Sequence, residues 1–64
     1  MYDIVEKEKA RIRKIILLNG NRMNYLDLIQ RYDLSRTILD ECLKEMNIDG
    51  DIFEPSFGFL GVVQ

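Results

Sequence analysis

The sequence predicts a single, mainly helical α+β domain spanning residues 1–64. Three observations support this prediction. A chain of 64 residues has room for one hydrophobic core and no second domain. Apolar residues recur at helical spacing up to residue 46, and a pattern of short apolar runs around Gly and Pro follows residue 47. The composition, 47% hydrophobic and 31% charged, is that of a folded chain.

The first helix is expected over residues 3–19. Gly20 follows at a position typical of a helix C-terminus. A turn at residues 19–21 leads into a brief extended piece at residues 22–23, and Asn24 is expected to cap the next helix. The apolar residues that define the first helix are Ile4, Val5, Ile12, Ile15, Ile16 and Leu18.

A short second helix of about eight residues is expected from Tyr25 to residues 32–33. Ser35 is expected to cap a third helix, with Leu34 and Leu39 placed to form a hydrophobic staple. The third helix has a buried stripe of Ile38, Leu39, Cys42, Leu43 and Met46. About three residues separate these two helices, which is the spacing of a helix-turn-helix without the usual glycine.

Two short strands around a turn are expected after the third helix. Residues 51–54 and 59–63 have strand character, and Pro55 and Gly58 between them favour a turn. The predicted order is therefore helix, strand, helix, helix, strand, strand. This is the order of a winged helix, with the C-terminal hairpin as the wing.

The residue inventory argues against catalysis. The chain contains no histidine and one cysteine, which excludes a metal site built from His or Cys and a Ser/His or Cys/His nucleophile pair. Asp40 and Glu41 are adjacent on a helix and point about 100° apart, so they do not converge on one substrate atom. Cys42 is interpreted as a buried, inert thiol. We expect neither an enzyme nor a cofactor.

The net charge of −2 conceals two halves of opposite sign. Residues 1–32 contain seven Lys or Arg and four Asp or Glu, which gives +3, whereas residues 33–64 contain two and seven, which gives −5. The third helix is expected to expose Arg36, Thr37, Asp40, Glu41, Lys44 and Glu45. Three acids would then oppose two bases, and the wing has no base of its own, so tight duplex binding is not expected.

The first helix carries the candidate phosphate contacts. Lys7, Arg11 and Lys14 form a ridge along one side of it, with Lys9 and Arg13 on another side. The alternative is a solvated face whose charges are neutralised locally. The pairs expected in that case are Asp3 with Lys7, Glu6 with Lys9, and Glu8 with Arg11.

Phe57 and Phe59 flank Gly58 in the hairpin. Alternation places both rings on one side of the sheet with Leu60 on the other. Phe57 is interpreted either as a cover for the core or as an exposed aromatic anchor for a protein partner.

The last third of the chain resembles a known family. The resemblance covers residues 43–60, and its motif reads Asp49-Gly50-Asp51-Ile52-Phe53-Glu54-Pro55-Ser56-Phe57-Gly58-Phe59. It is similar to the end of the C-terminal winged-helix domain of archaeal minichromosome maintenance (MCM) proteins. The resemblance implies a domain of a hexameric replicative DNA helicase, tethered by a flexible linker, that modulates helicase and ATPase activity or contacts replication partners. Ser56 and Leu60 stand where the family often has Lys or Arg.

Three hypotheses of function follow. The first is a non-catalytic accessory module of an MCM-type helicase, with weak or no DNA binding. The second is a stand-alone winged-helix transcription regulator that reads bases with Ser35, Arg36 and Thr37. The third is an adaptor that binds only protein, through Phe57 and its surroundings, with Phe59 as the second candidate contact.

The expected location is the cytoplasm, at the nucleoid. No stretch approaches the roughly 18 to 20 apolar residues of a membrane span, the first residues are too charged for a signal peptide, and a lone cysteine fits a reducing compartment. The expected partners are other domains of a helicase hexamer or replication proteins, and the isolated domain is expected to be a monomer.

Overall fold

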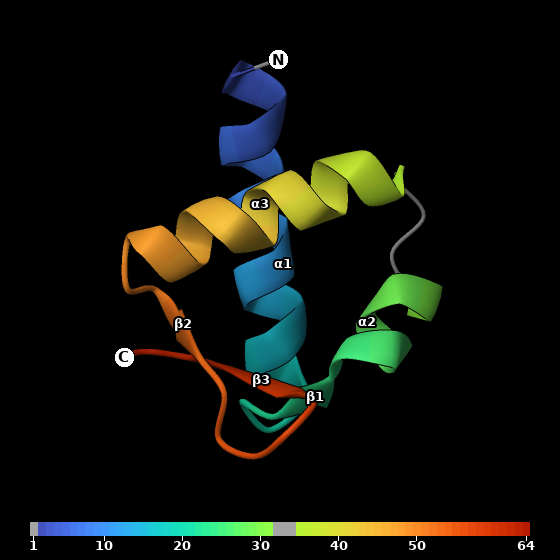
Figure 1. Ribbon diagram of the computed structural model, residues 1–64, viewed down its shortest axis with the longest axis vertical. Helices are drawn as coiled ribbons and strands as arrows, with labels where there is room; N and C mark the ends of the chain where they lie inside the picture. The colour runs from blue at the N-terminus through green and yellow to red at the C-terminus, as the bar shows by residue number, and fades with distance from the viewer. Residues whose placement is uncertain (1, 32–34) are drawn as a thin grey trace.

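Three helices and a three-stranded antiparallel sheet make up the fold, in the order expected from the sequence (Figure 1). The computed structural model describes residues 2–31 and 35–64, with side chains from residue 4 onward. The elements are α1 (Tyr2–Leu18), β1 (Met23–Asn24), α2 (Tyr25–Arg31), α3 (Arg36–Ile48), β2 (Ile52–Phe53) and β3 (Phe59–Val62). In Figure 1, α3 crosses α1, and the strands gather near the C-terminal end of α1.

The helix α1 ends at a turn that is fastened to the sheet. Gly20 and Asn21 both have positive φ, at 75° and 56°, a conformation that Gly and Asn tolerate best. The Asn21 side chain donates to the carbonyl oxygen of Val62 at 3.0 Å and accepts from the amide of Val62 at 2.7 Å. One amide side chain therefore pairs with β3 as a strand residue would.

Both expected helix caps are confirmed. Asn24 accepts a hydrogen bond from the amide of Leu26 at 2.8 Å, at the start of α2. Ser35 accepts from the amide of Ile38 at 3.3 Å and caps α3. The expected end of the second helix at residues 32–33, and the staple contact of Leu34, lie outside the described residues.

The sheet is short and has the strand order β1-β3-β2. Met23 pairs with Leu60 across β1 and β3, and Ile52 pairs with Val62 across β2 and β3. The strand β2 spans two residues, fewer than the four expected, because pairing stops where the chain turns at Pro55. The central strand β3 therefore joins the segment between α1 and α2 to the C-terminal hairpin.

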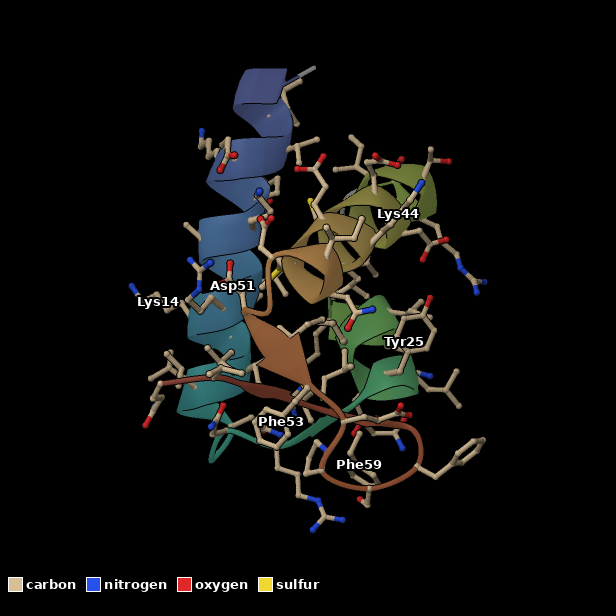
Figure 2. The ribbon with its side chains drawn as sticks, turned by 60° about the vertical axis from the view of Figure 1, so that its left-hand side comes forward. Lys14, Tyr25, Lys44, Asp51, Phe53 and Phe59 are labelled. Atoms are coloured by element: carbon tan, nitrogen blue, oxygen red, sulfur yellow. The ribbon has the colours of Figure 1, made fainter. Side chains whose placement is uncertain are left out.

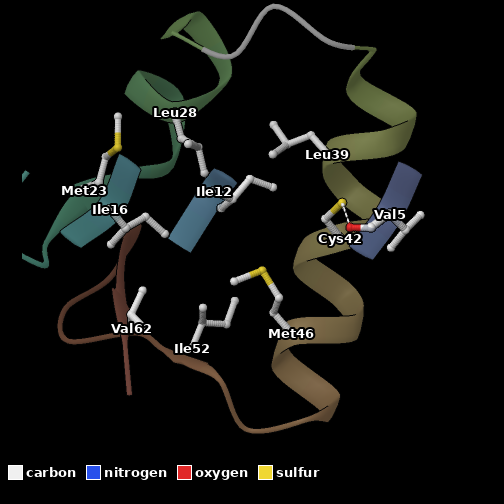
Figure 3. Packing of buried hydrophobic residues seen from close by; sticks show 10 residues of the cluster. All are labelled: Val5, Ile12, Ile16, Met23, Leu28, Leu39, Cys42, Met46, Ile52 and Val62. Atoms are coloured by element: carbon white, nitrogen blue, oxygen red, sulfur yellow. Dashed lines mark hydrogen bonds between the residues drawn. The ribbon is translucent and has the colours of Figure 1, made fainter. Parts of the chain in front are cut away.

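Every element contributes to one core (Figure 3). The buried apolar residues are Val5, Ile12, Ile16, Met23, Leu28, Leu39, Cys42, Met46, Ile52 and Val62. The stripe expected on the third helix is confirmed, since Leu39, Cys42 and Met46 are buried and Ile38 and Leu43 pack against them. The Cys42 thiol donates to the carbonyl oxygen of Val5 at 3.7 Å, which ties α3 to the first turns of α1.

Candidate interaction surfaces

The ridge on α1 is exposed, as the sequence predicts. Lys7, Arg11 and Lys14 all lie at the surface. The Arg11 guanidinium is 3.4 Å from a carboxylate oxygen of Glu8, the pair expected from helical spacing. Among the described residues, Lys7 and Lys14 have no acidic partner within 4.0 Å, and the side chain of Asp3 lies outside the described set. The ridge therefore retains two exposed ammonium groups (Lys14, Figure 2).

Lys9 does not belong to a second basic surface, contrary to what the sequence suggests. It is buried, with 6% of its surface exposed. Its ammonium lies 3.1 Å from Glu6, 3.2 Å from Glu45 and 3.8 Å from Asp49. The hydrogen bond to Glu6, with further support from Glu45, raises the pKa of Lys9 above its ordinary value against the opposing effect of burial. The ion pair of Lys9 with Glu6 is the one expected.

Arg13 is likewise engaged within the fold. Its guanidinium donates to Asp51 at 3.1 Å, from α1 to the residue before β2. Arg13 and Lys9 thus bind carboxylates from the acidic half of the chain. The opposite charges of the two halves therefore meet within the domain itself.

The outer face of α3 is less acidic than expected. Glu45 turns toward Lys9 of α1, and Glu41 is half-buried. Asp40 accepts a hydrogen bond from the Tyr25 hydroxyl at 2.8 Å and lies 3.8 Å from the Nε of Arg36. The expectation that this face exposes three acids is wrong, because Glu41 and Glu45 are half-buried and Glu45 pairs with Lys9. Asp40 remains exposed and lies near Arg36, one of the two expected bases.

A cation missed by the sequence analysis reaches the hairpin from β1. Arg22 donates to the hydroxyl of Ser56 at 2.7 Å, and its guanidinium lies 4.4 Å from the centre of the Phe59 ring. Residues 45–64 contain no Lys or Arg, as expected, but the inference that the hairpin therefore has no cation available to it is wrong. Pairing of Met23 with Leu60 carries Arg22 there, and no local sequence signal marks a contact over 34 residues.

The two hairpin phenylalanines separate into different environments. Phe59 is half-buried beneath Arg22, while its neighbour Leu60 packs toward the core, as alternation predicts. Phe57 lies in the loop before β3 and is 98% exposed. The expectation that Phe57 shares a sheet face with Phe59 is wrong, since it precedes the strand. Phe57 therefore does not cover the core, and its position matches the other interpretation, an exposed aromatic side chain.

A groove of about 480 Å³ opens between α3, the hairpin and the first residue of α2. Apolar side chains of Leu43, Ile52 and Leu60 line it. Lys44 and Glu54 line it as well, and Figure 2 shows Lys44 and Tyr25 on the same side of the molecule. Asp40 is a third charged side chain in the lining, so the groove combines apolar walls with one base and two acids.

The remaining chemistry is sparse in the described part of the chain. Burial raises the pKa of the Cys42 thiol, so this sulfur is a poor nucleophile at neutral pH. Residues 2–31 and 35–64 contain no group of three or more His, Cys, Asp or Glu side chains placed to hold a metal ion. No helix within those ranges is both long and apolar enough to cross a membrane.

The chain matches no family model, no curated protein and no solved structure. The residues and their geometry therefore carry the functional argument.

Proposed function

We propose that this chain is a winged-helix domain acting as a non-catalytic accessory module of an MCM-type DNA replication helicase. It contacts a protein partner through its hairpin and has at most weak DNA contact through α1. The observation that carries this proposal is Phe57, which is 98% exposed at the tip of the wing. A wing contacts phosphate through Lys or Arg side chains, whereas an exposed aromatic suits a pocket on a protein.

The resemblance motif has physical roles in the fold that support the proposal. Gly50 and Gly58 have φ values of 78° and 82°, so residues with a side chain would be strained at both positions. Pro55 lies where the first hairpin strand ends. The carboxylate of Glu54 accepts from the amide of Gly58 at 3.0 Å. The residues that define the motif at positions 49–59 are thus those that this hairpin conformation requires.

Weak DNA contact through α1 follows from the charges that the fold leaves exposed. Lys7 and Lys14 are exposed, whereas Lys9 and Arg13 bind carboxylates of the domain itself. Affinity for DNA depends mainly on the number of phosphates neutralised. Two or three contacts give a weak, strongly salt-dependent interaction.

A stand-alone DNA-binding regulator is the second candidate, and one observation favours it. Arg22 is held at the wing by Ser56 and Phe59. Together with Arg36 and Lys44 on the outer face of α3 it would supply three cations to a duplex. In this case α3, rather than α1, would contact DNA.

An NMR titration separates the two candidates. Short single-stranded and duplex DNA is added to the labelled domain at low and at moderate salt, and backbone amide shifts are followed by residue. The accessory module predicts small shifts around Lys7, Arg11 and Lys14 that disappear with salt, and their loss in a Lys7→Ala/Lys14→Ala variant. The matched variant Arg36→Ala/Lys44→Ala should bind as the original chain does.

The opposite pattern would sink the accessory proposal. Large shifts in α3 and the hairpin, abolished by Arg36→Ala/Lys44→Ala and preferring one duplex sequence, would establish the regulator instead. A complete absence of shifts would remove the DNA contact of α1 and leave a module that binds only protein.

A further inference from the structure

Hydrogen bonds fix the backbone of the hairpin loop on both sides of the exposed Phe57. The amide of Phe59 donates to the carbonyl oxygen of Ser56 at 2.9 Å, and the amide of Tyr25 donates to the carbonyl oxygen of Gly58 at 2.9 Å. Glu54 and Arg22 add side-chain hydrogen bonds to Gly58 and Ser56. Phe57 is therefore presented on an ordered loop, which lowers the entropy that a binding partner must overcome.

The groove beside this loop has the character of a receptor for such a ring. Its volume of about 480 Å³ falls within the range of sites that enclose small apolar groups. Leu43, Ile52 and Leu60 supply apolar walls. A phenyl ring placed there would exchange water contact for apolar contact on both sides.

The exposed ring and the groove are neighbours in the same chain. Gly58 lines the groove and directly follows Phe57, yet Phe57 points into solvent and leaves its own groove open. Two copies related by a two-fold axis near the loop could each place Phe57 in the groove of the other. In such an interface every contact occurs twice.

Two of the three charged side chains that line the groove fit the same arrangement. Among the described residues, Lys44 and Glu54 have no ion-pair partner within 4.0 Å, although both line the groove. In a two-fold pair, Lys44 of one copy can face Glu54 of the other, and the reverse contact forms at the same time. A different protein would need to have its own acid opposite Lys44 and its own base opposite Glu54.

We propose that the occupant of the groove is a second copy of this chain, with Phe57 of each copy inserted beside Leu43, Ile52 and Leu60 of the other. The contact is small against the ~800 Å² per partner of a standard interface. The pair is therefore weak, and the isolated domain is monomeric when dilute. When several copies are tethered in one assembly, their millimolar effective concentration populates the contact. The tethering rests on the proposed function, whereas the self-association of the domain does not.

The first test follows the labelled domain by NMR and sedimentation equilibrium, without DNA, from about 0.05 mM to about 2 mM. Concentration-dependent shifts are expected at Phe57, Gly58 and Lys44, together with a rising average mass. Phe57→Ser should raise the dissociation constant by about tenfold or more. Leu18→Ser is the matched control, because Leu18 is 79% exposed on α1 and does not line the groove; it should leave association unchanged.

A charge exchange tests the two-fold arrangement. Lys44→Glu and Glu54→Lys should each weaken self-association, because each homodimer would oppose like charges. An equimolar mixture of the two variants should restore it, since both contacts become attractive in the mixed pair. Glu54→Lys also removes the hydrogen bond from the Gly58 amide. Spectra of each dilute variant that overlay the original outside the changed residue and this loop therefore establish that the fold is retained.

Three results would overturn the proposal. They are a constant monomer mass up to the highest concentration, equal weakening by Leu18→Ser and Phe57→Ser, and a charge-exchanged mixture no tighter than either variant alone. Each is independent of the DNA titration, so this inference can fail while the proposed function stands.

Discussion

Two regions on either side of α3 contrast in how they use charge and apolar surface. On the side facing α1, an ionic seam formed by Lys9, Arg13, Glu45, Asp49 and Asp51 joins the basic half of the chain to the acidic half. On the other side, the hairpin loop and groove leave Phe57, Lys44 and Glu54 without such partners among the described residues. The ion pairs of the seam therefore hold parts of this chain together, whereas the groove side is exposed to a second molecule.

The largest loss of stability is expected when core volume beneath the seam is removed. Met46 is fully buried on α3, and Met46→Ala should lower the free energy of unfolding by about 2–5 kcal/mol through lost burial and a residual cavity. Ile48→Ala, two residues further along and 73% exposed, should change it by less than about 0.5 kcal/mol. Urea denaturation measures both. Similar losses for the two variants would contradict the packing of α3.

The position of Gly61 in β3 leaves no room for a side chain. A Cβ added at Gly61 would lie 2.9 Å from ring atoms of Phe53 and 3.0 Å from the carbonyl oxygen of Asn21. Gly61→Ala should therefore cost about 1–3 kcal/mol by overpacking, measured by the same denaturation. In a Phe53→Ala background the ring conflict disappears, so the added cost of Gly61→Ala should fall. An unchanged cost would assign the effect to the backbone of Asn21.

The seam is predicted to have a pH signature. The pKa of Lys9 is raised above the unfolded value of 10.5, so the charged form stabilises the folded state. This contribution is fully present below about pH 10.5 and is lost as the pH rises through the folded value. Lys9→Met should lower Tm at neutral pH, by less than Gly61→Ala does.

Thermal melts of both chains across the alkaline range check the sign. The difference in Tm between Lys9→Met and the original chain should stay level up to about pH 10.5 and shrink above it. Lys14→Met is the matched control, because Lys14 is exposed on the same helix, and its Tm difference should stay small throughout. A Lys9→Met difference that grows with alkaline pH would contradict the role of the charge.

The smallest effect on stability is expected at the hairpin tip. Phe57→Ser removes a side chain that is 98% exposed, so the free energy of unfolding of the dilute domain should change by less than about 0.5 kcal/mol. Chemical denaturation at low protein concentration provides the measurement. A loss comparable to that of Gly61→Ala would show that Phe57 supports the fold, and the contrast between the seam and the groove side would fail.

Local patterns predicted the elements because their causes lie within a few residues. The capping roles of Asn24 and Ser35 and the positive φ at Gly20 and Gly58 depend on side chains and backbone close in sequence. The buried stripe of α3 follows from the helical period alone. The short-range pairs Glu6 with Lys9 and Glu8 with Arg11 were also predicted, since three residues bring side chains together on a helix.

The long-range contacts escaped prediction because nothing local marks them. Lys9 and Glu45 are 36 residues apart, and Asn21 binds Val62 across 41 residues. Arg22 reaches Ser56 through the pairing of β1 with β3. Each depends on which strand lies in the centre of the sheet and how α3 crosses α1, and these are properties of the whole packed chain.

By itself, the sequence determined the order of the elements, the caps of α2 and α3, the apolar face of α3 and the opposite charges of the two halves, because periodicity and local hydrogen bonding are encoded within one or two helical turns. Only the tertiary structure decided which charged side chains form ion pairs within the domain and which remain exposed to a partner. That division depends on through-space distance. Packing of α1 against α3 paired Lys9 with Glu45, and the segment before β2 brought Asp51 to Arg13. The hairpin loop left Phe57 in solvent beside an open groove.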